Sequence, residues 1–143
     1  MIRRARAAEH VAVARLHRRV RTLCLPYLPD LHTPDEDLAF FRERVFRDCA
    51  VWVADVGPIV GYGAFRDGWV DHLYIDPDHH RRGLGAALLA PAMTAQADLR
   101  LWVFQRNLPA IRFYEAMGFR LVETTGGSAN EEREPDALYA WSR

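Results

Sequence analysis

The 143-residue sequence predicts an α+β (mixed α/β) fold, in which helices flank a central mixed, mostly antiparallel sheet. Two patterns indicate this class. Three strand-like segments with short connections follow one another in the first half of the chain, which is typical of an antiparallel meander. Strand and helix patterns then alternate, which is typical of a sheet covered by helices. The length fits one domain over residues 1–143, because domains usually contain about 100–200 residues.

A strand and two helices are expected before the meander. Ile2–Arg6 reads as a short strand, and residues 8–20 carry apolar side chains at helical spacing. The second helix is expected to begin after Thr33, because Thr33 and Glu36 can form a capping box around Pro34 at the first helical position. The residues expected on its buried face are Leu38, Phe41 and Val45.

Two more helices are expected in the second half of the chain. One runs from Gly83 to about Gln96 and contains Pro91, which should kink or shorten it. Asn107 is placed to cap the other helix and Gly118 to end it. The apolar faces expected for the two helices are Leu84, Leu88, Ala92 and Ala95, and Ala110, Phe113, Tyr114 and Met117.

The remaining segments complete the sheet. Asp67-Gly68 is a good two-residue turn between the second and third meander strands. The strands expected after the first are Val51–Asp55, Ile59–Arg66, Trp69–Ile75, Leu99–Val103, Phe119–Glu123 and Ala137–Ser142. The predicted order of elements is therefore β-α-α-β-β-β-α-β-α-β-β.

Composition excludes several functions. The net charge is zero, which disfavours a protein that coats nucleic acid or an anionic membrane. All nineteen Lys+Arg residues are Arg, so Schiff-base chemistry and a P-loop lysine are excluded. Cys24 and Cys49 lack metal-site spacing, and no metal site is expected. Without a signal-peptide pattern or a long apolar run, the expected location is cytoplasmic.

The loop after the third meander strand carries the main motif. Gly83 and Gly85 let the backbone approach a ligand closely, and the helix start that follows offers free N–H groups and a positive dipole end. Arg81 and Arg82 add positive charge, so the loop predicts a site for a phosphate or pyrophosphate. A Walker loop is excluded because the lysine is absent, and a dinucleotide fingerprint because Leu88 replaces its third glycine.

The segment His80-Arg-Arg-Gly83-Leu-Gly85 resembles the acetyl-CoA motif [Gln/Arg]-x-x-Gly-x-[Gly/Ala] of the GNAT (Gcn5-related N-acetyltransferase) superfamily, with His80 at the first position. Leu73-Tyr-Ile-Asp-Pro resembles that family's fourth strand, and Asn107–Phe119 its fourth helix and the Gly-Phe that follows. The resemblance covers nearly the whole chain. It implies the GNAT acyl-CoA N-acyltransferase fold and direct transfer of an acetyl group from acetyl-CoA (coenzyme A) to an amine in a ternary complex.

The resemblance also implies a set of cofactor contacts. In the family the fourth strand pairs with the pantetheine arm, and the glycine motif holds the pyrophosphate mainly through backbone amides. The cofactor-binding residues expected on this basis are Leu73, Tyr74, Ile75, His80, Arg81, Arg82, Gly83, Leu84, Gly85, Ala86, Asn107, Ala110, Phe113 and Tyr114.

Three catalytic tasks follow from direct attack of an amine on a thioester. Tyr114 matches the family's helix-four tyrosine and is the expected acid for the thiolate, with a reference pKa of about 10 against about 8.5 for a thiol. A strand-four glutamate that serves as base in some members falls here on Trp69. Asp71 and His72 are the alternative bases, unless bulk water suffices or the amine enters neutral. A backbone N–H near Leu73 is the expected oxyanion donor.

The acceptor is the least defined part of the prediction. The family places its acceptor cleft against the segments that are Leu23–His32 and Gly126–Asp136 here. The expected acceptor-binding residues are Tyr27, His32, Glu131, Glu132 and Glu134, of which the acids would attract a cationic amine. A small-molecule primary amine is the first expectation. Alternatives are a protein or peptide acceptor, a regulator that binds acyl-CoA without turnover, and a toxin that acetylates charged transfer RNA, which the neutral charge disfavours. The family also allows a homodimer.

Overall fold

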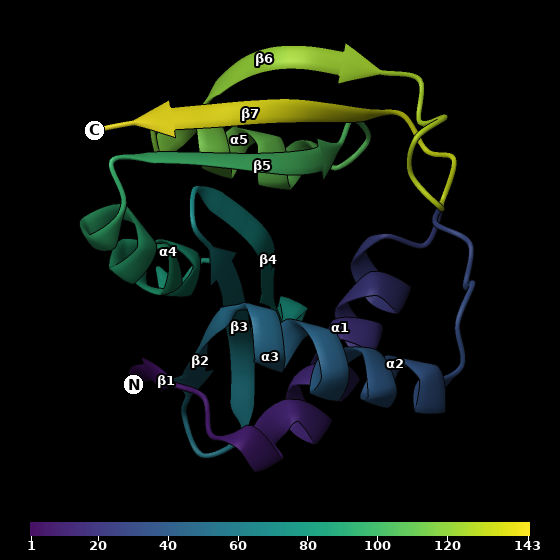
Figure 1. Ribbon diagram of the computed structural model, residues 1–143, viewed down its shortest axis with the longest axis vertical. Helices are drawn as coiled ribbons and strands as arrows, with labels where there is room; N and C mark the ends of the chain where they lie inside the picture. Colours follow the sequence, from purple (N-terminus) through teal and green to yellow (C-terminus); the bar gives the residue numbers. More distant parts are fainter.

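The computed structural model describes all 143 residues and confirms the predicted fold class and the order of the predicted elements (Figure 1). Seven strands form one sheet in the order β1-β2-β3-β4-β5-β7-β6. The elements are β1 (Ile2–Arg4), α1 (His10–Cys24), α2 (Pro34–Phe40), α3 (Phe46–Asp48), β2 (Ala50–Asp55), β3 (Ile59–Arg66), β4 (Trp69–Ile75), α4 (Leu84–Ala95), β5 (Asp98–Phe104), α5 (Leu108–Ala116), β6 (Arg120–Thr125) and β7 (Asp136–Ser142).

Pairing divides the sheet into two parts. Strands β1 to β4 form an antiparallel meander, and β5, β7 and β6 form a second antiparallel group. The groups join through β4 and β5, which run parallel and share one register pair, Trp69 with Arg100. Beyond that pair the two strands diverge, as Figure 1 shows. The edge of β4 that faces β5 is therefore free of a strand partner over most of its length.

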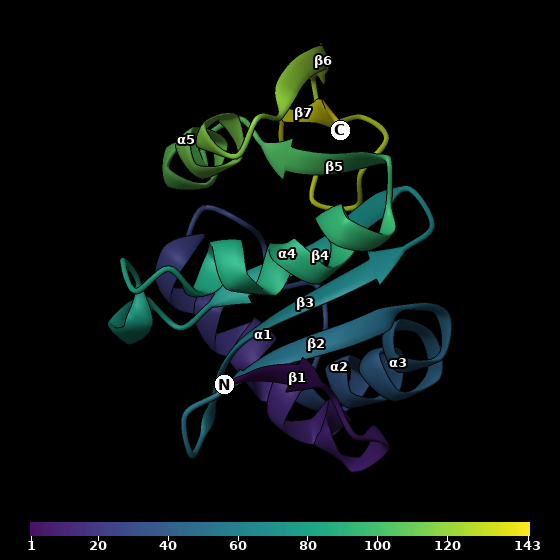
Figure 2. The same cartoon turned by 90° about the vertical axis from the view of Figure 1, so that its left-hand side faces the viewer.

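The two faces of the meander carry different helices. Helices α1 and α2 cover one face, where Val13, Phe41 and Tyr62 belong to one buried cluster. Helix α4 covers the other face, where Leu89 packs with Phe65 in a second cluster that extends to α5 and the β5–β7–β6 group. Figure 2 shows α4 in front of β3 and β4, with α1 behind them. Strand β4 therefore lies between two separately packed layers.

The helices differ from the prediction in four respects. Helix α1 continues to Cys24, and α2 continues through a π-helical turn at Phe41–Val45 into the short α3. Helix α4 runs through Pro91 to its predicted end, because the burial of Leu88, Leu89 and Ala92 in the core outweighs one lost hydrogen bond. Ala95, in contrast, is exposed at the end of the helix and does not belong to the buried face.

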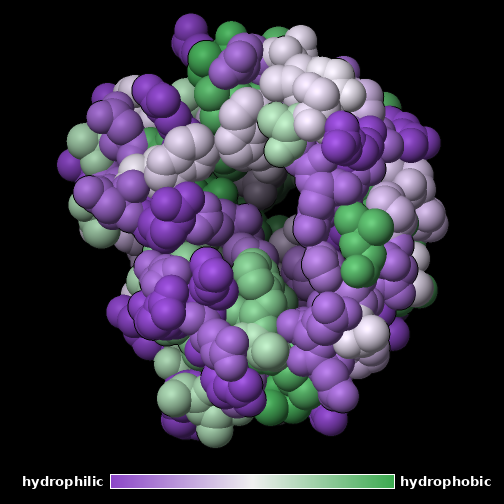
Figure 3. Space-filling view, turned by 45° about the vertical axis from the view of Figure 1, so that its right-hand side comes forward, coloured by the Kyte–Doolittle hydropathy of each residue, from purple (hydrophilic) through white to green (hydrophobic).

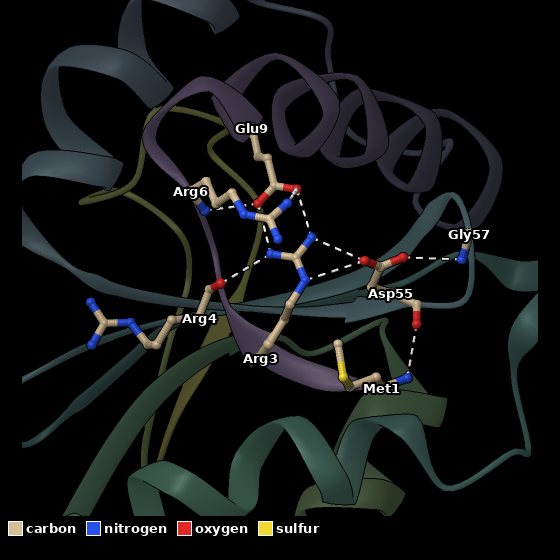
Figure 4. A network of polar contacts seen from close by, with 7 residues as sticks. All are labelled: Met1, Arg3, Arg4, Arg6, Glu9, Asp55 and Gly57. Atoms are coloured by element: carbon tan, nitrogen blue, oxygen red, sulfur yellow. Dashed lines mark hydrogen bonds and ion pairs between the residues drawn. The ribbon is translucent and has the colours of Figure 1, made fainter.

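An ion-pair network anchors the first strand (Figure 4). The guanidinium of Arg3 lies 2.7 Å from a carboxylate oxygen of Glu9 and 3.0 Å from one of Asp55. The backbone amine of Met1 donates to the carbonyl of Asp55 at 2.8 Å. Hydrogen bonds from Arg3 and from the backbone of Arg6 lower the pKa of Glu9 to about 2. The network joins β1, the start of α1 and the end of β2.

None of the helices combines the length and the apolar character that a membrane span requires. The two cysteines are unpaired, and no group of three His, Cys, Asp or Glu side chains is arranged to hold a metal ion.

Candidate active site

The loop between β4 and α4 has the geometry of an anion cradle. Gly83 adopts the left-handed conformation at φ +75°, and Arg81 also has a positive φ of 64°. The backbone N–H groups of residues 81–86 have no acceptor within the chain. Arg81 and Arg82 are exposed and form no ion pair. Free amides at a helix start beside unpaired arginines fit a pyrophosphate.

The second glycine of the motif lies where two helices meet. A Cβ atom on Gly85 would lie 3.1 Å from Cζ of Phe113, so the ring of Phe113 on α5 packs against the first turn of α4. This contact links the loop to the helix that carries Tyr114. The predicted cofactor residues Leu84, Gly85, Ala86, Ala110 and Phe113 are thus brought close together, although their contacts with the cofactor stay predictions.

The side chain of His80 has a different position from the rest of the motif. Its Nε2 lies 3.0 Å from the carbonyl oxygen of Ile75, so the ring braces the loop against the end of β4. Asp76 accepts from the amide of Asp78 and pairs with Arg19 of α1 at 2.8 Å. The loop is therefore held on both sides by the chain itself. A contact between His80 and the cofactor stays a prediction.

The unpaired edge of β4 begins beyond Trp69. The side chains along it alternate in direction, since Leu73 packs toward α4 and Tyr74 toward α1. An exposed strand edge can pair with an extended chain through backbone hydrogen bonds. The edge at Leu73, Tyr74 and Ile75 thus fits the predicted role of holding the pantetheine arm.

Tyr114 and Asn107 both have structural roles that the sequence had indicated. The Asn107 side chain accepts from the amide of Ala110 and caps α5. Tyr114 is 7% exposed and packs edge-on against Phe119 and Phe113. Burial raises the pKa of Tyr114 above its usual range, so the phenol is protonated at neutral pH, as a proton donor must be. The catalytic role of Tyr114 stays a prediction.

A β-bulge separates the two predicted bases. Ala64 pairs with His72 and Phe65 with Val70, so Asp71 is the extra residue of β4. The Asp71 carboxylate forms an ion pair with the guanidinium of Arg66 and accepts from Sγ of Cys49 at 3.5 Å. Asp71 is thus engaged in a salt bridge, which makes it the weaker of the two candidate bases.

His72 lies in an aromatic cluster on the α1 face of β4. Its ring is 5.6 Å from that of Phe41, and its Nδ1 lies 2.9 Å from the hydroxyl oxygen of Tyr62. Burial lowers the pKa of His72 to about 4, so the imidazole is neutral at pH 7 and one of its two nitrogens carries a lone pair. Tyr62 was not predicted as a site residue, because a tyrosine within a central strand reads as part of the core.

A cavity of about 460 Å³ opens beside α1. It is bounded by α1, the α1–α2 connection, the start of α2 and the β6–β7 loop. The molecule is hollowed in the middle of the face shown in Figure 3, and the rim of that hollow is mostly hydrophilic. The charged side chains that line the cavity are Arg18, Arg21, Asp30, Glu36, Asp37 and Glu131. Carboxylates therefore outnumber guanidinium groups.

The predicted acceptor residues divide into two groups. His32 and Glu131 line the cavity and lie 3.0 Å apart. Glu132 pairs with Arg21 at 3.3 Å. These pairs connect the β6–β7 loop to α1 and to the α1–α2 connection.

Glu134 and Tyr27, like Glu132, do not line the cavity. Glu134 is buried and accepts two hydrogen bonds from Arg106, at 2.7 and 2.8 Å. The guanidinium of Arg106 also lies 4.3 Å from the ring centre of Tyr27. An arginine of the chain already pairs with each of the Glu132 and Glu134 carboxylates, and their contact with a cationic amine stays a prediction. The sequence could not show pairs so distant along the chain.

Comparisons with known proteins agree with this geometry. A family described as acetyltransferase (GNAT) domain matches residues 47–121. The chain is 28% identical to the Escherichia coli peptidyl-lysine N-acetyltransferase YiaC over 99% of this chain and 96% of that protein. The solution structure of apo YjaB from Escherichia coli superimposes with a TM-score of 0.81 at 23% identity, over 99% of this chain and 96% of YjaB.

A second structure, the putative acetyltransferase yncA from Salmonella typhimurium with its cofactor acetyl-CoA, has a TM-score of 0.74 at 20% identity, over 99% of this chain and 92% of yncA. The family match includes β2 to α5, and so the glycine loop, the free edge of β4 and the helix of Tyr114. The chain therefore belongs to the GNAT family of acetyl-CoA-dependent N-acetyltransferases.

Proposed function

We propose that the acceptor of the acetyl group is the side-chain amine of lysine residues in proteins. The observation that carries the proposal is the charge of the cavity beside α1. Four carboxylates, from Asp30, Glu36, Asp37 and Glu131, line it against the two guanidinium groups of Arg18 and Arg21. A lysine ammonium is attracted to such a surface, since Arg18 neutralises Asp30 and Asp37 only in part.

The apolar lining of the cavity supports the same acceptor. Leu25, Leu28 and Phe40 supply apolar surface between the charged groups. A lysine has a four-carbon stem that packs on apolar surface while its charged head stays near polar groups. The relative YiaC, which aligns along nearly its whole length, is named a peptidyl-lysine N-acetyltransferase. The lining and the charge of the cavity and the name of the relative YiaC therefore favour the same acceptor.

A small-molecule primary amine is the second candidate. The volume of about 460 Å³ falls in the range of roughly 300–1,000 Å³ that is usual for small-ligand sites. A polyamine or an amino sugar would satisfy the same carboxylates. The two candidates differ in whether residues that flank the amine contribute to binding.

An acceptor panel tests the proposal. Purified protein is mixed with acetyl-CoA and with peptides whose α-amine is blocked and which contain one lysine, and release of the free thiol is followed. We expect release with the lysine peptides, and none with the same peptides carrying arginine in place of lysine. Turnover of spermidine or amino sugars alone would select the second candidate, and no release with any amine would reject both.

A pair of variants connects the activity to the cavity. Glu131→Gln removes a cavity carboxylate and should raise the KM for the lysine peptide about threefold or more while leaving acetyl-CoA binding unchanged. Glu123→Gln makes the same change on the exposed edge strand β6 and should leave both constants as they are. Equal KM values for the two variants would show that the cavity carboxylate of Glu131 does not contribute to binding of the lysine peptide.

A further inference from the structure

Three side chains between α1 and the sheet are joined by hydrogen bonds. The hydroxyl of Tyr62, in the middle of β3, lies 2.9 Å from Nδ1 of His17 on α1 and 2.9 Å from Nδ1 of His72 on β4. Tyr62 has no exposed surface. Water cannot replace either bond there, and a buried polar group that lacks a partner is costly. The chain of bonds is therefore a fixed part of the structure.

Counting protons shows that the two imidazoles differ. The Tyr62 hydroxyl has one proton to donate, so it can donate to only one of the two Nδ1 atoms. The other Nδ1 must carry a proton and donate it to the Tyr62 oxygen. With both rings neutral, one histidine is therefore the Nδ1–H tautomer and the other is the Nε2–H tautomer. Moving one proton along each bond exchanges the two tautomers.

The outer members of this chain lie at different places in the candidate active site. His17 lines the cavity beside α1. His72 lies at the bulge of β4, next to Leu73, whose backbone N–H is the predicted oxyanion donor. Several charged or titratable groups face these three hydrogen-bonded side chains. They are Arg18 and Arg21 from α1, Asp37 from α2, Asp71 and Tyr74 from β4, and Cys49 before β2.

We propose that His72, Tyr62 and His17 form a proton relay from the attacking amine to the acceptor cavity, an inference that rests on the proposed function. Nε2 of His72 takes the proton that the amine nitrogen loses as the new C–N bond forms. Nδ1–H of His72 passes its proton to the Tyr62 oxygen, and the Tyr62 hydroxyl proton moves to Nδ1 of His17. Nε2–H of His17 releases its proton to water in the cavity.

The protons balance over this step. The amine nitrogen loses one proton, cavity water gains one, and all three side chains end neutral with the histidine tautomers exchanged. The opposite shift resets the chain after the products leave: cavity water returns a proton to Nε2 of His17, and His72 loses its Nε2 proton to water at the vacated reaction centre. No oxidant or other reagent is needed.

Burial explains why a relay is more effective here than a single base. The pKa of His72 is lowered to about 4 and that of His17 is lowered well below its usual range, in both cases chiefly by burial. A lone His72 would therefore have to hold a poorly solvated positive charge. Transfer through Tyr62 leaves both rings uncharged, so the burial that weakens each imidazole as an isolated base opposes the relay much less.

The first test needs no acceptor. Long-range ¹H–¹⁵N NMR spectra of the intact protein at pH 7 report which nitrogen of each imidazole carries the proton. We expect His17 and His72 to be neutral and to have opposite tautomers, and Tyr62→Phe to abolish this complementarity. Equal tautomers in the wild-type protein, or a charged ring at pH 7, would overturn the relay.

The second test is kinetic and uses the α-blocked lysine peptide with acetyl-CoA. His17→Asn keeps a hydrogen-bond partner for Tyr62 but cannot carry a proton, and Tyr62→Phe keeps the aromatic ring. Both should lower kcat about tenfold or more with the KM for the peptide within about threefold. The dependence of kcat on the deuterium content of water should be curved for the wild type and linear for His17→Asn.

A control separates chemistry from packing. Tyr139→Phe removes a hydroxyl from another buried tyrosine, in β7, and should leave kcat unchanged. Unfolding and acetyl-CoA titrations establish that the variants are folded and bind the cofactor. If Tyr62→Phe and His17→Asn retain kcat within about twofold while His72→Asn loses it, His72 acts alone and the relay is wrong. If the wild type acetylates no amine, the proposed function fails, and the tautomers alone decide the relay.

Discussion

A single methyl group on Gly83 tests whether the loop is preformed for the cofactor. A Cβ atom built on Gly83 meets no atom within 4 Å, so Gly83→Ala introduces no clash. The backbone at φ +75° nevertheless lies in the left-handed region, which costs an L-residue roughly 1–2 kcal/mol. The effect of the substitution therefore reports almost only the free-energy cost of the left-handed backbone conformation at residue 83.

The cost can appear in two measurements. If the loop keeps its shape without the cofactor, the free energy of unfolding falls by about 1 kcal/mol and the acetyl-CoA affinity is unchanged. If the free loop relaxes, stability is kept and the dissociation constant for acetyl-CoA rises about fivefold, since 1.4 kcal/mol corresponds to about tenfold. The two losses together should come to about 1 kcal/mol, because the bound loop needs the left-handed residue in either case.

Denaturant unfolding and calorimetric titration with acetyl-CoA measure the two terms. Gly68→Ala is the matched control, because Gly68 has φ +77°, an equally open Cβ position and a place in the β3–β4 turn away from the cofactor. It should lose stability by a similar amount and keep its affinity. Gly126→Ala, open and without a positive φ, should change neither. A Gly83→Ala protein with wild-type stability and wild-type affinity for acetyl-CoA would refute the expectation that the cofactor binds to a loop with a left-handed residue at position 83.

Three further predictions concern other parts of the molecule. Tyr114→Phe should bind acetyl-CoA normally and lower kcat about tenfold or more, whereas an unchanged kcat in the thiol-release assay would exclude Tyr114 as the acid. Arg106→Met leaves the buried carboxylate of Glu134 unpaired. The Tm of this variant should therefore fall further than the Tm of Arg120→Met, a substitution on the exposed edge strand. Equal Tm values for the two variants would contradict this expectation. The lowered pKa of Glu9 contributes stability that is present above pH 4.5 and is lost as the pH falls toward about 2. The Tm of Glu9→Gln should therefore vary less than that of the wild type over this interval. Parallel plots of Tm against pH for the two proteins would count against the network in Figure 4.

The sequence predicts the elements well where periodicity is local. The bounds Ile59–Arg66 and Trp69–Ile75 are those observed for β3 and β4, because the Asp67-Gly68 turn fixes where one strand ends and the next begins. The capping box at Thr33 is also present. These features depend on residues a few positions apart, which a single sequence displays directly.

The register of the hairpin could not be predicted in the same way. A regular hairpin about Asp67-Gly68 would place Asp71 opposite Ala64 and turn His72 toward α4. The observed bulge instead pairs His72 with Ala64 and turns it toward α1. Each strand still reads as apolar on one face, so the pattern does not show a one-residue slip. The contact between His72 and Tyr62 was therefore hidden at the level of sequence.

The salt bridges of the predicted acceptor residues could not be predicted from the sequence for a different reason. Arg21 and Glu132 are 111 residues apart, and Arg106 and Glu134 are 28 apart. Such contacts depend on where the β6–β7 loop crosses the sheet, and the sequence of the loop shows only that it is acidic. An acidic loop is equally compatible with a ligand surface and with internal salt bridges.

The bulge in β4 also fits the proposed role of this strand beside both substrates. The glycine loop leads into α4 on one face of β4, and the cavity is bounded by α1 on the other. Because the bulge shifts the alternation, His72 and Tyr74 share the α1 face while Leu73 packs toward α4. A strand without the bulge would turn His72 away from Tyr62 and end the connection to His17 on which the proposed relay depends. The position of a single extra residue thus decides which side chains of β4 face α1, because every side chain that follows it in the strand changes face.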